Sequence, residues 1–156
     1  ATLTWGQVDI EGRLWHLPDP KSRRPITFPL SDVAAKILAD RDHTGNFVFP
    51  SRGETGHITS ARGLMRKISE VIGAPVSPHD LRRTFRAVAA ECRVELWRTK
   101  LLMGHRVSGD VTINSYTETS DLRYLKPEAD IVANWIQQQA VIVLSEKVIS
   151  LNAPIG

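Results

Sequence analysis

The hydrophobic pattern of the chain changes its period near residue 31, and this change constrains the fold more than any other feature of the 156 residues. Before it, apolar runs at residues 8–10, 14–17 and 26–28 are separated by turn and loop residues, which predicts a three-stranded antiparallel meander. After it, apolar residues recur at helical spacing. Strands that precede the helices, instead of alternating with them, predict an α+β fold, mostly helical with a small three-stranded sheet near the N-terminus.

Two helices are expected directly after the strands. Ser31 has the side chain and the position to cap the first one. The second begins at about residue 59, and Gly73 followed by Pro75 stops it. Its sequence gathers apolar side chains on one face that we expect to be buried, namely Leu64, Met65, Ile68, Val71 and Ile72.

The strongest helix start is SPHD at residues 77–80, which supplies a serine cap, a proline at the first helical position and an acid three residues after the cap. His79 and Arg82 then lie on the exposed side of this helix. Because they are three residues apart beside its positive N-terminal end, their side chains can converge on one point that suits an anion. The opposite stripe is expected to be buried and consists of Leu81, Phe85, Val88, Ala89 and Cys92.

The last third of the chain contains further helix signals. A helix over about residues 95–103 ends at Gly104, so His105 lies just past a helix end. A turn at residues 108–110, a short helix over residues 111–116 and a longer helix opened by Pro127 follow. The apolar run at residues 140–144 fits either a continuation of that helix or a strand.

Net charge is +3 and the pI is about 9.3, which is too mild to name a partner. Residues 79–106 hold seven Arg or Lys against three acids, a local excess of the kind that phosphate binding requires. The same charges also fit the solvated faces of two helices, so charge does not decide between the two interpretations.

The single cysteine, Cys92, excludes an internal disulfide, and no Cys/His cluster has the spacing of zinc ligands. The sequence contains no signal-peptide pattern and no run of about eighteen apolar residues. We therefore expect one domain over residues 1–156, in the cytoplasm, with no metal, no cofactor and no membrane partner.

Three linked segments resemble the C-terminal motifs of the tyrosine recombinase, or phage integrase, family. They are HDLRRTF at residues 79–85, LLMGH at residues 101–105 and Tyr116. The similarity extends from about Trp5 to Gln139, with WGQVDI at residues 5–10 and PITFPLS at residues 25–31 resembling the family's first and third strands. The order of the three C-terminal motifs, and a spacing that nearly matches that of the family, make the resemblance specific.

This resemblance implies a site-specific recombinase that acts on double-stranded DNA attachment sites together with other protomers of the same protein. Tyr116 would be the nucleophile that forms a 3′-phosphotyrosyl bond, which conserves the bond energy for rejoining. Arg82 would neutralise the phosphate, and His79 and His105 would handle protons. Lys21, in the turn between the second and third strands, would protonate the leaving 5′ oxygen. Further DNA contacts are expected from Arg83, Arg86 and Arg106.

The sequence departs from the family pattern in three respects. The family's first catalytic arginine lies in a helix before the first strand, and its core-binding domain lies further upstream; neither is in these residues. We therefore expect a partial catalytic domain from a prophage or mobile element that does not cleave DNA by itself. The interval from His105 to Tyr116 is also longer than in many relatives, which a longer turn at residues 108–110 can absorb.

Two other function classes compete with this interpretation. A DNA-binding module without catalysis, such as a helix-turn-helix regulator, would make the His, Arg, His and Tyr set coincidental. A type IB topoisomerase shares phosphotyrosine chemistry but relaxes supercoils. For the tail at residues 140–156, docking on a neighbouring protomer and completion of the domain's own core are equally compatible with the sequence.

Overall fold

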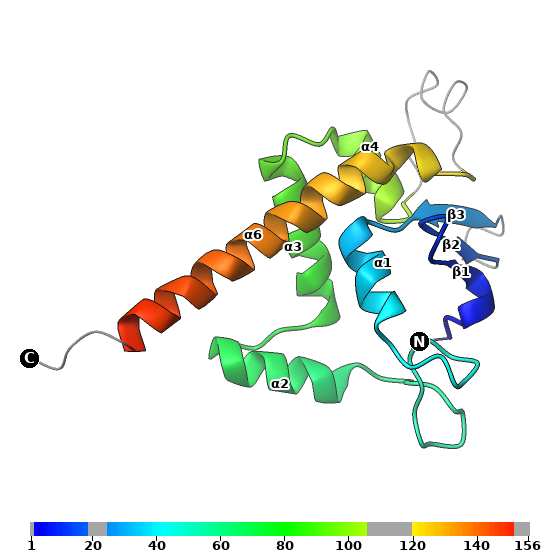
Figure 1. The fold of residues 1–156 in the computed structure, drawn as a ribbon, viewed down its shortest axis with the longest axis horizontal. Coiled ribbons are helices and arrows are strands. Elements are labelled where there is room, and N and C mark those ends of the chain that lie inside the picture. The colour runs from blue at the N-terminus through cyan, green and yellow to red at the C-terminus, as the bar shows by residue number, and fades with distance from the viewer. Residues whose placement is uncertain (1, 19–24, 106–119, 152–156) are drawn as a thin grey trace, which may run out of the picture.

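The computed structural model describes residues 2–18, 25–105 and 120–151, the last eight of these as helix backbone only. This described part is α+β and mostly helical, as the sequence predicts (Figure 1). Its elements in order are η1 Trp5–Gln7, β1 Val8–Asp9, β2 Leu14–Leu17, β3 Ile26–Pro29, α1 Asp32–Ala39, α2 Arg62–Ile72, α3 Pro78–Glu91, α4 Leu96–Leu102, η2 Arg123–Leu125 and α6 Lys126–Leu151.

The predicted sheet is confirmed as an antiparallel meander in the order β1-β2-β3, with Trp15 paired to Val8 on one side and to Phe28 on the other. The Trp15 and Phe28 rings also stack, with centroids 4.6 Å apart. Phe28 enters a core cluster with Leu101 of α4 and with two leucines, Leu122 and Leu125, that are almost completely buried. The sheet therefore packs against α4 and the segment that leads into α6.

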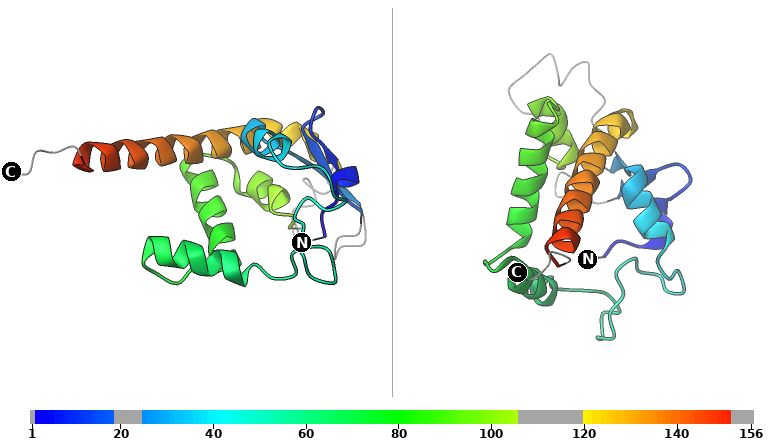
Figure 2. Two further views of the ribbon diagram at one scale, coloured as in Figure 1. Left: turned by 60° about the horizontal axis from the view of Figure 1, so that its bottom comes forward. Right: turned by 60° about the vertical axis from the view of Figure 1, so that its left-hand side comes forward.

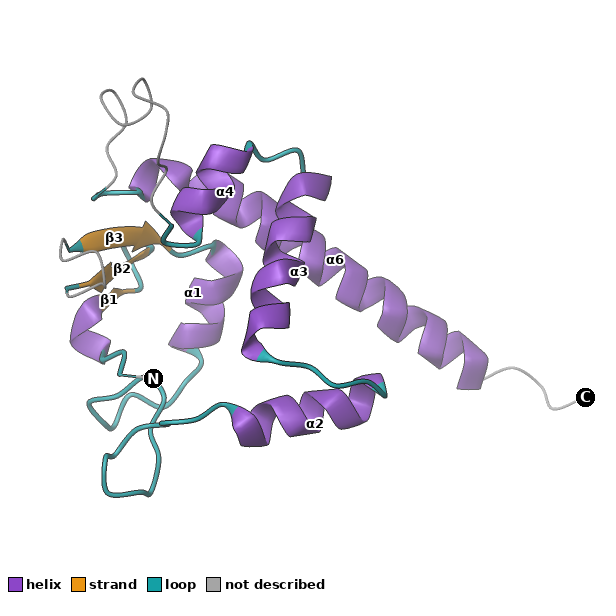
Figure 3. Cartoon of the chain, turned by 180° about the vertical axis from the view of Figure 1, so that it is seen from behind, coloured by secondary structure: helices purple, strands orange, loops and turns teal. Residues whose placement is uncertain are grey.

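Helix α6 joins this sheet core to a second core. It lies against both α1 and α3 (Figures 1 and 3). Val132 of α6 is buried against Val88 and Ala89 of α3. The start of α1 is tied to the first turns of α6, because the Asp130 carboxylate accepts a hydrogen bond from the backbone N–H of Asp32 at 2.9 Å.

The distal part of α6 settles the ambiguous run at residues 140–144. Those residues continue the helix, so the strand alternative is wrong. The helix projects beyond the rest of the molecule (Figure 2), and its side chains Val141, Ile142 and Val143 are exposed. Among the described ranges, no helix is both long enough and apolar enough to cross a bilayer.

Two predicted buried faces are partly wrong. Helix α2 forms within the predicted range and ends at Gly73, yet of its five apolar residues only Met65 is buried, and Val71 is 84% exposed. In α3 the stripe is confirmed at Val88 and Ala89, but Leu81 is 48% exposed. Both errors have one cause: α6 packs against the middle and end of α3 and does not cover its first turn or α2.

Candidate active site

The N-terminus of α3 is fixed by the predicted capping box. Ser77 Oγ accepts a hydrogen bond from the backbone N–H of Asp80 at 3.3 Å, and the Asp80 carboxylate accepts one from the backbone N–H of Ser77 at 3.0 Å. The Ser77 hydroxyl also donates to that carboxylate at 2.6 Å. These bonds from Ser77 lower the pKa of the Asp80 carboxyl below its usual value, with smaller contributions from Arg83 and His79. These hydrogen bonds define where α3 begins.

The C-terminus of α4 is closed by a glycine. Gly104 has φ +71°, the left-handed conformation that glycine adopts without strain. The backbone N–H groups of His105 and Gly104 donate to the carbonyls of Lys100 and Leu101 at 2.9 and 2.8 Å, the paired bonds of a Schellman motif. The Met103 carbonyl at this helix end accepts neither of these two bonds.

The two helix ends meet at Arg82. Its Nη1 donates to the Met103 carbonyl at 2.9 Å and lies 3.0 Å from His105 Nε2. These partners are 21 and 23 residues away in the chain, so the tertiary fold brings the two predicted residues together. A guanidinium at a helix C-terminus is also favoured by the helix dipole.

His79 lies one turn before Arg82 on α3 and is exposed, as the sequence predicts. It makes no hydrogen bond or ion pair with the described part of the chain. His79 is therefore on the same helix as Arg82, three residues before it, with an exposed side chain.

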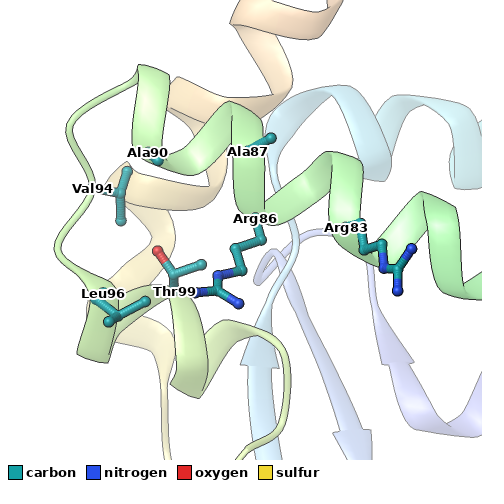
Figure 4. Close-up of a pocket in the computed structure, with 7 residues that line it drawn as sticks. All are labelled: Arg83, Arg86, Ala87, Ala90, Val94, Leu96 and Thr99. Carbon is teal, nitrogen blue, oxygen red and sulfur yellow. The ribbon is translucent and has the colours of Figure 1, made fainter.

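Arg83 and Arg86, predicted as DNA contacts, are both exposed on α3. Arg83 has a loose ion pair with Asp80 at 3.6 Å, while Arg86 forms no ion pair with the described residues. Together they border a pocket of about 330 Å³ between α3 and α4 (Figure 4). The rest of its lining is mainly apolar: Ala87, Ala90, Val94, Leu96 and Thr99.

Helix α4 is held in place by a charge cluster that the sequence analysis missed. Arg98 donates to Glu95 at 2.8 Å and to Glu128 of α6 at 2.5 Å, and it lies over the Trp97 ring. The hydrogen bond with Glu95, followed by the charge of Glu128, raises the pKa of Arg98 above its usual value. No sequence signal identifies the Arg98–Glu128 pair, because the two residues are 30 positions apart. The contact of Arg82 with the Met103 carbonyl was also not predicted, because every residue has a backbone carbonyl and the sequence does not mark this one.

Three predicted site residues, Lys21, Arg106 and Tyr116, lie outside the described residues. The described part of the chain resumes at Ser120, which lies beside β3. Thr27 of β3 donates to the carbonyl of Ser120 and accepts from the backbone N–H of Leu122, both at 2.8 Å. Tyr124, the other tyrosine, is part of η2.

Comparisons with known proteins bear on this fold and site. The profile of the Phage integrase family matches residues 1–123, so the chain belongs to this family of site-specific recombinases. Among solved structures, the fold is similar to an integrase from mycobacterium phage Brujita, with a TM-score of 0.60 and 21% sequence identity. That match covers 85% of this chain and 45% of the Brujita integrase, so the chain spans less than half of that protein's length. A comparison with curated protein sequences gives no significant match.

Proposed function

We propose that this chain is the catalytic part of a recombinase that cleaves and rejoins DNA through a 3′-phosphotyrosyl intermediate at Tyr116. Its substrates would be the attachment sites of a prophage or mobile element in the bacterial cytoplasm. One observation carries the proposal: Arg82 and His105, from two separate family motifs, are hydrogen-bonded partners on an exposed surface. Membership of the phage integrase family supports it.

The chemistry needs a cation because a phosphodiester is an anion that repels an incoming phenolate. Arg82 would bind the non-bridging oxygens, since its planar guanidinium presents several donors to a phosphate. The phenol of Tyr116 is a weak nucleophile at its ordinary pKa near 10 and would need a neighbouring base such as His79. As the Tyr116 oxygen bonds to phosphorus, the bond to the 5′ oxygen breaks and Lys21 would supply the proton to that oxygen.

Rejoining would run the same steps in reverse. A 5′-hydroxyl from a second DNA strand would attack the phosphotyrosyl phosphorus, and Tyr116 would leave with a proton returned to it. Because the number of phosphodiester bonds is conserved, exchange between two strands costs little free energy. Arg83, Arg86 and Arg106 would contact neighbouring phosphates, each adding to affinity without reading sequence.

Covalent trapping tests the assignment of Tyr116. The full recombinase that carries this chain would be incubated with a nicked attachment-site duplex, and protein–DNA adducts would be separated by denaturing electrophoresis. We expect an adduct with the native protein and none with Tyr116→Phe, which removes only the nucleophilic oxygen. Tyr124→Phe is the matched control and should form the adduct normally. An adduct that persists in Tyr116→Phe would refute the assignment.

The tail at residues 140–156 is proposed to pack on a neighbouring protomer on DNA. Support comes from α6, whose apolar residues Val141, Ile142 and Val143 are exposed on the projecting part of the helix. Deleting the tail and measuring the mass of the DNA-bound assembly tests this proposal. A smaller assembly is expected, whereas an unchanged mass with a lower melting temperature would assign the tail to the domain's own core.

A further inference from the structure

The outer edge of β3 is covered by the chain that leads into α6. In the sheet, β3 pairs with β2 on one side only, and the free edge of a strand exposes unpaired N–H and C=O groups. At Thr27 both groups are used by this chain: the N–H donates to the Ser120 carbonyl and the C=O accepts from the Leu122 N–H, each at 2.8 Å. Thr27 and Asp121 form a parallel bridge. We call residues 120–122 the β3 anchor.

The β3 anchor is held by the core and by a charge pair as well. Leu122 is 1% exposed and packs in the cluster that contains Phe28 and Leu101. Arg123 Nε donates to the two carboxylate oxygens of Asp121 at 3.0 and 2.8 Å, at the point where the chain enters η2. Detaching the anchor would expose a buried leucine and break two backbone hydrogen bonds, so the anchor is a fixed point of the domain.

The same strand touches the end of α4. A Cβ at Gly104 would lie 3.6 Å from Cζ of Phe28, so the Phe28 ring packs against the turn that ends this helix. The next residue, His105, contacts Arg82. Since Phe28 directly follows Thr27, a short series of direct contacts joins the β3 anchor to the Arg82–His105 contact of the same chain.

Chain length limits where Tyr116 can lie relative to this anchor. Tyr116 precedes Ser120 by four residues, and four fully extended residues span at most about 14 Å. Whatever conformation the intervening residues adopt, the Tyr116 Cα stays within that radius of Ser120. The centre of this sphere is the edge of β3, the strand that packs against the end of α4.

From these contacts we propose that the β3 anchor assigns Tyr116 to the site on its own chain, and that Thr27 is the positioning residue whose backbone holds the anchor. A tether of this length favours a phosphate bound at Arg82 of the same protomer over one bound on a neighbouring protomer. The inference rests on the proposed function for the identity of the nucleophile, but the anchor itself does not.

Mixing two inactive proteins tests the assignment to one chain. Full recombinase with Tyr116→Phe keeps Arg82, whereas full recombinase with Arg82→Ala keeps Tyr116. The two would be combined on a nicked attachment-site duplex and adducts separated by denaturing electrophoresis. No protomer in the mixture holds both groups, so we expect no more adduct than the two proteins form separately. Native protein mixed with Tyr116→Phe is the control, and it should still form adduct. An adduct that appears only when the two inactive proteins are mixed would overturn the proposal.

Two substitutions at Thr27 test the anchor bond itself. Thr27→Pro removes the N–H that donates to Ser120, while Thr27→Val keeps this N–H and removes only the hydroxyl, which lies 3.0 Å from His16 Nδ1. In the full recombinase at saturating protein, we expect Thr27→Pro to form the adduct at least about tenfold more slowly than Thr27→Val, because the nucleophile is misplaced. The Kd for the same DNA should be similar in both. Equal rates of adduct formation in the two variants would count against the proposal.

Amide exchange examines the anchor without any cleavage. In the full recombinase free of DNA, hydrogen–deuterium exchange would be followed by mass spectrometry on peptides that span residues 120–125. We expect slow exchange in the native protein and in Thr27→Val, and faster exchange in Thr27→Pro. Native exchange as fast as in an unstructured peptide would sink the inference, even if Thr27→Pro does not fold. This readout is independent of Tyr116 trapping, so failure of the proposed function and failure of the anchor are distinguishable.

Discussion

Helices α2 and α3 are neighbours in the chain and both are amphipathic, yet only α3 has most of its apolar face covered. In α3, Val88 and Ala89 are buried against Val132 of α6. In α2, Leu64 is 60% exposed and Val71 is 84% exposed. The comparison shows that helical periodicity specifies which side of a helix is apolar but not which element covers it. In this protein the position of α6 decides that the apolar face of α3 is covered.

The two helices also differ at their ends. Helix α3 begins with the Ser77–Asp80 capping box, whereas the residue before α2, Ala61, provides no side-chain cap. At the C-terminal ends the order reverses. Helix α2 ends on Gly73 with φ +74°, while the chain after α3 turns through Arg93 with φ +57°, a conformation that strains a residue with a Cβ. The well-capped end of α3 is the one that carries Arg82, a predicted site residue.

The largest expected difference between the helices comes from truncating a core contact. Val132→Ala should lower the free energy of unfolding by about 2 kcal/mol, because it removes buried methyl groups and leaves a cavity against α3. Val71→Ala, on the exposed face of α2, should change it by less than about 0.5 kcal/mol. Chemical denaturation of the 156-residue chain measures both. Equal losses would show that α2 is covered in solution as fully as α3.

This contrast also marks how far the sequence alone leads. Strand runs, the Ser77 cap and the glycine stops at Gly73 and Gly104 are local signals, and the structure confirms the elements they predict. The exposure of Leu64 and Leu81 was not foreseeable, because it depends on where α6 lies. At the candidate site, residue type and family resemblance predict His79, Arg82 and His105, and the structure shows Arg82 in contact with His105. The Met103 carbonyl and the Arg98–Glu128 pair depend on tertiary contacts and leave no such trace.

A smaller effect is expected from substitutions at Gly73 and Arg93, the residues with left-handed backbone at the ends of α2 and α3. Gly73→Ala introduces about 1 kcal/mol of left-handed strain, partly offset by about 0.5 kcal/mol from the lower entropy of the unfolded chain, so a net loss of about 0.5 kcal/mol is expected. Arg93→Gly reverses both contributions and should gain a similar amount. Arg93 is exposed and makes no ion pair with the described residues, so its side chain contributes little otherwise. Thermal unfolding of the two variants checks the opposite signs, and a loss in both would show that Arg93 is unstrained.

The smallest expected effect concerns pH and the capping box. The folded pKa of Asp80 is lowered by its bonds from Ser77, so its contribution to stability is present above the unfolded pKa near 3.8 and is lost as pH falls through the folded pKa. Asp80→Asn should therefore melt lower than the native chain at pH 7, and the two melting curves should converge under strongly acidic conditions. The Asp80 side chain is 44% exposed, so solvent screening limits its contribution to stability. Glu70→Gln is the matched control on α2, because its pair with Arg66 at 3.8 Å is exposed and should contribute little at any pH. A gap between Asp80→Asn and the native chain that persists unchanged into acid would mean that shape, not charge, secures the start of α3.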